Sequence, residues 1–349
     1  METEQPNKVR VGLVGTGFGQ EHLTWLGSLP DVSVDWLAYG HDRERAEALA
    51  REYEIRHVTP EWQELISAPL TAVVIVTPVA LHYPIAKAAL SAGKVVVCDK
   101  PLALNSAEAE ELAQTATGSA LPSMTFFQWR FHAGPRTLRN WIRSGIFGVI
   151  QQIDLQFRHD FLAAPTTNWP WRHRIQTAGA GAFGDLGVHL IDLLLWLTGE
   201  DFEVAGASTL QAWKERTVAS DSNRGQTIVC ETEDAGQAWL RTGDGSLASI
   251  FVSRCAPEFR NIRIVVTGTS AGAILEIDPG SGNHVLQYRG PDGMQLPAEE
   301  ISLSPYSVWL DAIRNDASAE IPTFADGARA QKILDHVLRA AADRVASDL

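Results

Sequence analysis

Residues 9–20 of the chain read VRVGLVGTGFGQ, an apolar run that ends in three closely spaced glycines, Gly15, Gly17 and Gly19. The apolar run is typical of a short buried strand, and a helical pattern follows the glycines. Gly15 permits a tight turn, and Gly17 lets the backbone approach a ligand closely. Because the first N–H groups of a helix attract anions, this stretch predicts a strand, a phosphate-binding turn and a helix.

The glycine pattern is similar to the GxGxxG fingerprint of dinucleotide-binding folds, with one departure. The third fingerprint position holds Gln20 instead of Gly or Ala, and a glycine stands one residue earlier. A glycine turn that binds no ligand is the alternative interpretation, although a position between the first strand and a helix is the one that dinucleotide binding requires. We expect four residues of the turn to bind the pyrophosphate of a dinucleotide: Gly15, Gly17, Phe18 and Gly19.

The end of the second predicted strand, residues 32–39, bears on the choice between NAD and NADP. An NAD-preferring site usually has an acidic residue there, which binds the ribose 2′-hydroxyl. Here Gly40 stands at this point, and His41 and Arg43 are close enough in sequence to meet a 2′-phosphate. The sequence therefore favours NADP over NAD. Two alternatives stay open: Asp42 is an NAD-type acid if the loop is shifted by two residues, and Arg43 is a solvated residue of the next helix.

The composition limits the class of protein. With 349 residues, 45% of them hydrophobic and 20% charged, the chain is long enough for about two globular domains. Its 42 acidic residues exceed its 29 basic residues and give a net charge of −13, which argues against nucleic acid or an anionic membrane as a partner. A small anionic ligand is compatible with this charge, because backbone N–H groups hold it locally.

The three cysteines, Cys98, Cys230 and Cys255, are far apart and form neither a disulfide framework nor a metal-binding motif. They indicate a reducing compartment. The N-terminal residues lack an apolar stretch of signal-peptide length, and no apolar run reaches the ~18 residues of a membrane span. We therefore expect a soluble, cytoplasmic protein with no membrane partner.

The chain changes character near residue 123, which predicts two domains, 1–123 and 124–349. In the first domain short β-branched runs alternate with helical patterns, an order that is typical of a parallel sheet covered on both faces. Its expected strands are 9–14, 32–39, 72–76 and 95–98, and its expected helices are 21–28, 43–53, 85–92 and 105–116, the last capped by Asn105 or Ser106.

The sequence of the second domain predicts a mainly antiparallel sheet, because its strand-like runs follow one another and are separated by short turns. Its expected helices are 133–144, 184–198 and 326–347. Its expected strands are 149–159, 203–212, 226–233, 236–241, 247–253, 261–268, 272–277 and 284–288. The predicted fold class is therefore α/β.

Several separate segments carry a family resemblance. They are TPVALH at 77–82, CDKP at 98–101, QWRF at 128–131, GIFG at 145–148, WR at 171–172, GAG at 179–181 and DLGVHLID at 185–192. In this order and spacing the chain resembles the glucose–fructose oxidoreductase, inositol dehydrogenase and MocA family over nearly its whole length. Val79 departs from the family's TPNxxH loop, in which asparagine is usual.

The resemblance implies an N-terminal Rossmann domain followed by an α/β domain with a large, mostly antiparallel open sheet. In the family the outer face of that sheet commonly mediates assembly, which implies a homo-oligomer, a dimer or a tetramer. The implied reaction is NAD(P)-dependent oxidation or reduction at a ring carbon of a sugar, a sugar derivative or a cyclitol. The implied cofactor-side residues are Thr77, Pro78, His82, Asp99, Lys100 and Gln128, of which His82 is a structural support.

The predicted helix 184–198 carries Asp185, His189 and Asp192 at spacings that place all three on one face. A carboxylate one turn from an imidazole suits acid–base chemistry, so His189 is the candidate base that takes the proton of an alcohol. Lys100 is expected to stabilise the developing alkoxide, and Asp185 to hold a substrate hydroxyl or align the other two. The alternatives are a helix N-terminal acid for Asp185, a core histidine for His189 and an indirect role for Asp192.

Cationic and aromatic residues of the second domain are candidate substrate contacts. Arg130 and Arg172 suit substrate hydroxyls or a phosphate, and structural pairing with acidic residues is the alternative. Trp129, Trp169 and Trp171 suit the C–H face of a sugar, and core packing is the alternative. We expect no metal site, because the His and Asp of residues 185–192 have no thiolate companion and the other histidines are scattered.

Two other functions belong to different classes. One is glycoside hydrolysis assisted by a tightly held NAD that oxidises a ring carbon transiently. The other is a regulator that senses NAD(P) and binds a partner protein without catalysis. Lys100, Asp185 and His189 together argue against the regulator, because a pure sensor needs no such trio.

Overall fold

The computed structural model describes residues 8–220, 223–290, 296–298, 301–315 and 321–347. The chain forms two compact units. The first extends to Phe126 and also includes Ser304–Ala328, and the second comprises Phe127–Leu303 and the residues from Arg329 onward. The sequence predicted a single boundary between residues 123 and 124. In the structure the chain instead returns to the first unit with Ser304–Ala328.

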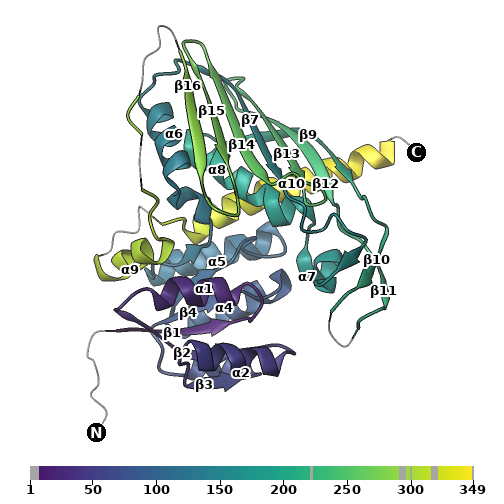
Figure 1. The fold of residues 1–349 in the computed structure, drawn as a ribbon. Helices are drawn as coiled ribbons and strands as arrows, with labels where there is room; N and C mark the ends of the chain where they lie inside the picture. The colour runs from purple at the N-terminus through teal and green to yellow at the C-terminus, as the bar shows by residue number, and fades with distance from the viewer. Residues whose placement is uncertain (1–7, 221–222, 291–295, 299–300, 316–320, 348–349) are drawn as a thin grey trace. The chain divides into compact units, whose positions relative to one another are not determined.

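The first unit contains a six-stranded parallel sheet (Figure 1). Its strand order is β3-β2-β1-β4-β5-β6, the order of a dinucleotide-binding sheet. The strands are β1 (Val9–Val14), β2 (Val32–Ala38), β3 (His57–Thr59), β4 (Ala72–Ile75), β5 (Val95–Cys98) and β6 (Met124–Thr125). Residues 72–75 of the central strand are completely buried, which accounts for their unbroken apolar sequence.

Helices surround this sheet. They are α1 (Gly19–Gly27), α2 (Arg43–Glu52), α3 (Trp62–Ser67), the short η1 (Val79–Leu81), α4 (His82–Ser91), α5 (Ser106–Ser119) and α9 (Pro305–Asn315). The expected cap of α5 is present, because the side chain of Asn105 accepts a hydrogen bond of 3.0 Å from the backbone N–H of Glu108. The sequence did not predict β3, β6, α3 or α9, of which the first three are very short.

Buried contacts explain why Ser304–Ala328 belongs to the first unit. The hydroxyl of Tyr306 in α9 lies 2.5 Å from Nδ1 of His22 in α1, and both side chains are fully buried. Burial lowers the pKa of His22 to about 4, so the ring is neutral at physiological pH. On the surface, Arg314 bonds to Asp31 at 3.0 Å.

The second unit is built on a seven-stranded sheet with the order β16-β15-β14-β7-β13-β12-β9 (Figure 1). Every neighbouring pair is antiparallel except β13 and β7, which confirms a mostly antiparallel open sheet. Its strands are β7 (Ile150–Arg158), β9 (Glu203–Leu210), β12 (Ala235–Arg241), β13 (Leu247–Ser253), β14 (Asn261–Gly268), β15 (Gly272–Ile277) and β16 (His284–Arg289).

A small three-stranded sheet in the same unit was not predicted. It consists of β8 (Thr166–Thr167), β10 (Glu215–Val218) and β11 (Thr227–Val229). The strand expected at 226–233 is therefore shorter than predicted, because residues after β11 form the turn that leads into β12.

The helices of the second unit are short apart from three. They are η2 (Gln128–Phe131), α6 (Ala133–Arg143), η3 (Pro170–His173), α7 (Ile175–Ala178), the π-helical turn η4 (Phe183–Gly187), α8 (Val188–Thr198) and α10 (Phe324–Ser347), which begins in the first unit. The expectation of one regular helix over 184–198 is wrong in its first turn, which is wound as a π-helix. Turns of this kind are frequent at functional sites.

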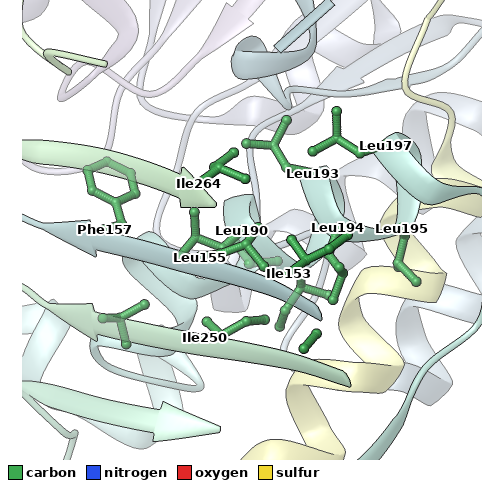
Figure 2. Close-up of a cluster of buried hydrophobic side chains, with 14 of the residues drawn as sticks. Ile153, Leu155, Phe157, Leu190, Leu193, Leu194, Leu195, Leu197, Ile250 and Ile264 are labelled. Carbon is green, nitrogen blue, oxygen red and sulfur yellow. The ribbon is translucent and has the colours of Figure 1, made fainter. Parts of the chain in front are cut away.

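The core of the second unit lies between α8 and the inner face of the seven-stranded sheet. Figure 2 shows leucines of α8, among them Leu190 and Leu194, beside Ile153 and Leu155 of β7 and Ile250 of β13. Residues 175–198 are the one described stretch that passes a length and composition test for a membrane span, and 89% of its most apolar window is buried inside the protein. Packing against the sheet accounts for its apolarity.

Candidate active site

The three glycines of the turn after β1 meet different surroundings. Gly15 has a φ of +112°, and a Cβ there would lie 2.4 Å from the carbonyl oxygen of Val76, so only glycine fits. A Cβ on Gly19 would lie 3.0 Å from the side chain of Leu13, which places this glycine against the strand. A Cβ on Gly17 would have no atom within 4 Å. No protein atom therefore fills the space beside Gly17, and a ligand can approach the backbone there.

We expect Gly17→Ala to weaken dinucleotide binding without weakening the fold. Because a Cβ at this position meets no protein atom, the free energy of unfolding should change by less than about 1 kcal/mol. Steric overlap with a pyrophosphate, at a typical cost of about 1–3 kcal/mol, should raise the Kd of the dinucleotide roughly 5- to 150-fold. Titration calorimetry and urea unfolding measure the two effects. Gly118→Ala, also at an open position, is the control, and an unchanged Kd in Gly17→Ala would contradict a pyrophosphate site here.

In the loop after β2, Arg43 has the solvated arrangement that was one of the two alternatives, and Asp42 is a helix cap. The carboxylate of Asp42 caps α2 by accepting a hydrogen bond of 2.9 Å from the N–H of Arg45. The side chain of Arg43 is 75% exposed and pairs with Glu47 at 2.7 Å. Arg45, which the sequence analysis did not single out, donates from Nε to the carbonyl oxygen of Thr16 at 2.8 Å. Arg45 thus ties α2 to the glycine turn.

His82 connects the loop after β4 with the loop after β5. Its ring nitrogens lie 2.9 Å from the carbonyl oxygen of Thr77 and 2.8 Å from that of Pro101. Burial lowers the pKa of His82, although the carboxylate of Asp99 and the two carbonyls oppose this effect. These contacts are those of a structural support. Asp99 itself accepts the backbone N–H of Lys100 at 2.8 Å, and Lys100 is partly buried at the end of β5.

Two of the expected cofactor-side residues have buried polar atoms without a hydrogen-bond partner in the described part of the chain. They are Oγ1 of Thr77, in the first unit, and Oε1 of Gln128, in the second unit. An unsatisfied buried polar atom is costly, so each of these two atoms is suited to a ligand that supplies the missing partner. Pro78 lies beside Thr77 as the residue that precedes η1.

In the second unit Asp185 projects from the π-helical turn η4 and meets two guanidinium groups. One carboxylate oxygen bonds to Nη1 of Arg172, and the other lies 2.9 Å from Nη1 of Arg254. His189 follows in the first turn of α8, where it is buried with its ring 6.2 Å from that of Phe127. The sequence analysis anticipated the carboxylate and the imidazole, but neither Arg254 nor the pairing of Asp185 with Arg172.

Aromatic rings lie around the guanidinium of Arg172. The ring of Trp171 lies 4.5 Å from its Cζ atom, and the rings of Phe161 and Trp169 lie 5.9 and 6.0 Å away. Trp171 is partly buried and Trp169 is exposed. These tryptophans therefore present ring surface beside a cation, as a sugar-binding surface requires.

The other two expected substrate contacts have structural partners. Arg130 is 8% exposed, and its Nε and Nη2 atoms bond to the carboxylate of Asp192 at 2.9 and 2.5 Å. Trp129 is buried and packs against His132 and Phe157. For Arg130 and Trp129 the structure therefore supports the alternatives, ion pairing and core packing. Asp192 reaches Arg130, which is consistent with an indirect role.

Metal ligands and reactive thiols are not found at this site. Among the described residues no group of three or more His, Cys, Asp or Glu side chains is arranged to hold a metal ion. All three cysteines are unpaired, and burial raises the pKa of the Cys98 thiol. Cys98 is thus a buried small residue of β5.

Comparison with known proteins agrees with the fold and with these motifs. Residues 9–125 match the model of the oxidoreductase family with an NAD-binding Rossmann fold, and residues 136–274 match the GFO/IDH/MocA C-terminal domain. The chain is 26% identical to levoglucosan dehydrogenase of Pseudarthrobacter phenanthrenivorans, with 96% of each chain covered. It is 30% identical to an uncharacterised oxidoreductase of Synechocystis, with 81% of this chain and 72% of the relative covered.

A solved structure shows the same architecture. The oxidoreductase domain protein from Kribbella flavida superposes with a TM-score of 0.81 at 25% identity, and the match covers 97% of this chain and 98% of that protein. Family models and relatives together span both units. The chain belongs to the GFO/IDH/MocA family of oxidoreductases, whose N-terminal domain is an NAD-binding Rossmann fold.

Proposed function

We propose that this protein transfers a hydride between a nicotinamide cofactor and a ring carbon of a sugar, a sugar derivative or a cyclitol. The observation that carries the proposal is the arrangement on η4 and α8. There a carboxylate, Asp185, is held between two guanidinium groups and is followed one turn later by His189. The similarity to a levoglucosan dehydrogenase supports a carbohydrate as the substrate class.

The residues of the chain have distinct roles in this proposal. Oxidation of a secondary alcohol requires removal of the hydroxyl proton as the hydride leaves, and His189 takes that proton or returns it in the reductive direction. The ammonium group of Lys100 stabilises the negative charge that develops on the reacting oxygen. Asp185 accepts a hydrogen bond from a substrate hydroxyl, and Trp171 and Arg172 contact the rest of the substrate.

A nicotinamide dinucleotide fits the residues present. The open space at Gly17 is suited to a ligand, as are Oγ1 of Thr77 and Oε1 of Gln128, which have no hydrogen-bond partner among the residues that the structure describes. When bound, the nicotinamide ring accepts or donates the hydride at its C4 atom. The residues proposed to hold the cofactor are Gly15, Gly17, Phe18, Gly19, His41, Arg43, Thr77, Pro78, His82, Asp99, Lys100 and Gln128.

We propose NADP as the preferred cofactor, because no carboxylate stands at Gly40 and two basic residues follow. The double variant His41→Ala/Arg43→Ala should then raise the Kd of NADP about tenfold or more and leave that of NAD nearly unchanged, since a hydrogen bond to a charged group contributes about 1.5–3 kcal/mol. Fluorescence titration with each cofactor measures this difference. Arg51→Ala, in the last turn of α2, is the control. Equal effects on both cofactors would contradict an NADP-specific contact.

The outer face of the seven-stranded sheet supports the proposal of a homo-oligomer. Trp239 of β12 and Leu247 of β13 are 41% and 54% exposed, and both lie on the face opposite the core. Exposed large apolar side chains on a sheet face are typical of a protein interface. A second copy of the chain is the proposed partner, and light scattering after size-exclusion chromatography measures the molecular mass of the assembly.

A panel of sugars and cyclitols tests the proposed function. Each is mixed with NAD or NADP, and the absorbance of the reduced nicotinamide is followed over time. The proposal predicts that at least one polyol reduces the cofactor stoichiometrically. Absence of reduction with every polyol, together with absence of oxidation of the reduced cofactors by the matching ketones, would contradict it. Cleavage of an aryl glycoside without net reduction of the cofactor would indicate redox-assisted hydrolysis instead.

A further inference from the structure

Asp185 is the last carboxylate in a line of alternating charges inside the second unit. Arg216 pairs with Asp234 at 3.1 Å, and Asp234 pairs with Nε of Arg254 at 3.3 Å. Arg254 then pairs through Nη1 with Asp185 at 2.9 Å, and Asp185 pairs with Arg172. The side chains of Arg216, Asp234 and Arg254 are 0% exposed, whereas that of Arg172 is 26% exposed. The line therefore runs from the interior of the unit toward its surface.

The strand register explains how Asp234 and Arg254 meet. Asp234 directly precedes β12, and Arg254 directly follows β13. The two strands are antiparallel neighbours with Ala235 opposite Ser253, so the flanking residues also come together. The N–H of Arg254 bonds to the carbonyl oxygen of Asp234 at 3.0 Å. The sheet thus fixes both ends of this ion pair.

The turn before β12 holds the backbone beneath Asp185 as well. The carboxylate of Glu233 accepts the N–H groups of Gly181 and Phe183, each at 2.9 Å. A Cβ on Gly181 would lie 1.9 Å from the carbonyl oxygen of Glu233, so the two segments touch backbone to backbone. The hydroxyl of Thr232 accepts a bond of 2.8 Å from Nη2 of Arg254. Residues 232–234 therefore support both the helical turn that carries Asp185 and the guanidinium that faces it.

Buried ion pairs of this kind are not the most stabilising way to fill a protein interior, because removing charges from water costs as much as their attraction returns. In some proteins their advantage is a defined geometry. Burial opposes the charge of Arg254, but the carboxylates of Asp185, Asp234 and Glu233 outweigh it and raise the pKa of the guanidinium. A permanent cation is thus fixed beside Asp185.

We propose that Arg254 is a positioning residue, which holds the Asp185 carboxylate ionised and in one orientation for the substrate, and that Asp234 and Thr232 hold Arg254 in turn. This inference rests on the proposed function, in which Asp185 binds a substrate hydroxyl. Asp185 then acts as a fixed hydrogen-bond acceptor, and proton transfer is left to His189.

The charged and titratable groups around Asp185 in the second unit come from several elements. Arg172 and His173 lie on η3, Glu233 and Asp234 precede β12, Arg254 follows β13, and His189 lies on α8. Burial and the two nearby guanidiniums of Arg254 and Arg216 lower the pKa of His173 to about 4, so this ring is neutral above pH 5. Of these groups, Arg172 and Arg254 pair directly with the carboxylate.

The test compares Arg254→Gln with Arg254→Lys and with Arg216→Gln. Loss of an adjacent opposite charge raises the pH at which a carboxylate ionises by about one unit or more. We expect Arg254→Gln to move the midpoint of the Asp185 carboxyl titration upward by that amount, and Arg254→Lys to restore its position. Arg216 is equally buried and pairs with the same Asp234 but not with Asp185, so Arg216→Gln should leave this midpoint unmoved even where it lowers stability.

Titration of carboxyl-¹³C aspartate, with the Asp185 signal assigned by Asp185→Asn, gives this midpoint without turnover. Thus a protein that oxidises no polyol disproves the proposed function but still tests the positioning role. If Arg254→Gln does not fold, Thr232→Val removes the hydroxyl that accepts a hydrogen bond from Nη2 of Arg254 and donates one of 2.9 Å to the carbonyl oxygen of Arg172, and kcat should fall severalfold at unchanged cofactor Kd. A midpoint of the Asp185 carboxyl titration that moves equally in Arg254→Gln and Arg216→Gln, or in neither, would overturn the proposal, as would an unchanged kcat in Thr232→Val.

Discussion

Replacement of Lys100 with methionine should lower kcat about 10²- to 10³-fold, the usual effect of removing a group that stabilises developing negative charge. Methionine has a similar length to lysine but no charge and no donor, so the reacting oxygen loses its cationic partner. The backbone N–H of residue 100, which bonds to Asp99, is retained, and the loop after β5 keeps that contact. The Kd of the dinucleotide should therefore rise far less than kcat falls, because the other residues proposed to hold the cofactor are unchanged. Steady-state kinetics and titration calorimetry on the same preparation measure the two quantities.

Lys87→Met is the control for this variant. Lys87 also lies in the first unit, where it pairs with Glu111 on the surface. Its loss should affect neither kcat nor cofactor binding, because the pair is half exposed and contributes little. Full activity of Lys100→Met would remove Lys100 from the reaction. A large loss of cofactor affinity in Lys100→Met would instead assign the residue to cofactor binding.

Replacement of His189 with asparagine should lower kcat about 10²- to 10⁴-fold, the range for loss of a general base. Asparagine is polar and slightly smaller than histidine, so the buried position between α8 and Phe127 is disturbed little. The kcat of the variant should also lose the dependence on pH that a titrating imidazole confers. A pH series of kcat with the best polyol substrate measures both effects.

His57→Asn provides the matched control, because His57 is an exposed histidine of β3 that stacks on Trp36. This variant should keep the wild-type kcat. If His189→Asn keeps it as well, while its urea unfolding shows a loss of stability, His189 is a packed core residue and the general base must be sought elsewhere.

The sequence predicted every strand of the seven-stranded sheet, in which one face is buried. The limits of β13, β14 and β15 agree with the expected ranges, because their apolar residues alternate or run unbroken between clear turns. The glycine turn was also visible, since a φ of +112° at Gly15 demands glycine whatever the rest of the fold. The cap at Asn105 is a local signal of the same kind.

What the sequence did not reveal depends on contacts between distant residues. Tyr306 meets His22 across 284 positions, so no local pattern indicates that Ser304–Ala328 belongs to the first unit. The π-helical turn at Asp185 was missed because the helix expected from the apolar residues of α8 was extended back over residues 184–187, although these include two glycines, which are poor α-helix formers. Arg254 and Asp234 were missed because they lie at strand ends where charged residues are common, and only the register of β12 and β13 brings them together.

The site residues that the sequence predicted are those that belong to a short, local sequence motif. Asp185 and His189 were identified from a short motif on one helix, and both lie where that motif suggested. The acidic partners of Arg130 and Arg172 were not predicted, because an arginine side chain is long enough to reach several acidic residues from one position. The net charge of −13 likewise gave no indication that three arginines are paired with two aspartates inside the second unit. These arginines are Arg172, Arg216 and Arg254.

Transfer of deuterium from the substrate ring to the nicotinamide is the most direct measurement of the proposed reaction. The polyol that turns over fastest is prepared with deuterium on its ring carbons and oxidised with the protein and the preferred cofactor. Mass spectrometry and proton NMR of the reduced cofactor should show one deuterium per turnover at C4 of the nicotinamide, and none when unlabelled polyol is oxidised in deuterated water. Reduced cofactor without deuterium from the ring, or deuterium taken up from the solvent, would contradict direct hydride transfer.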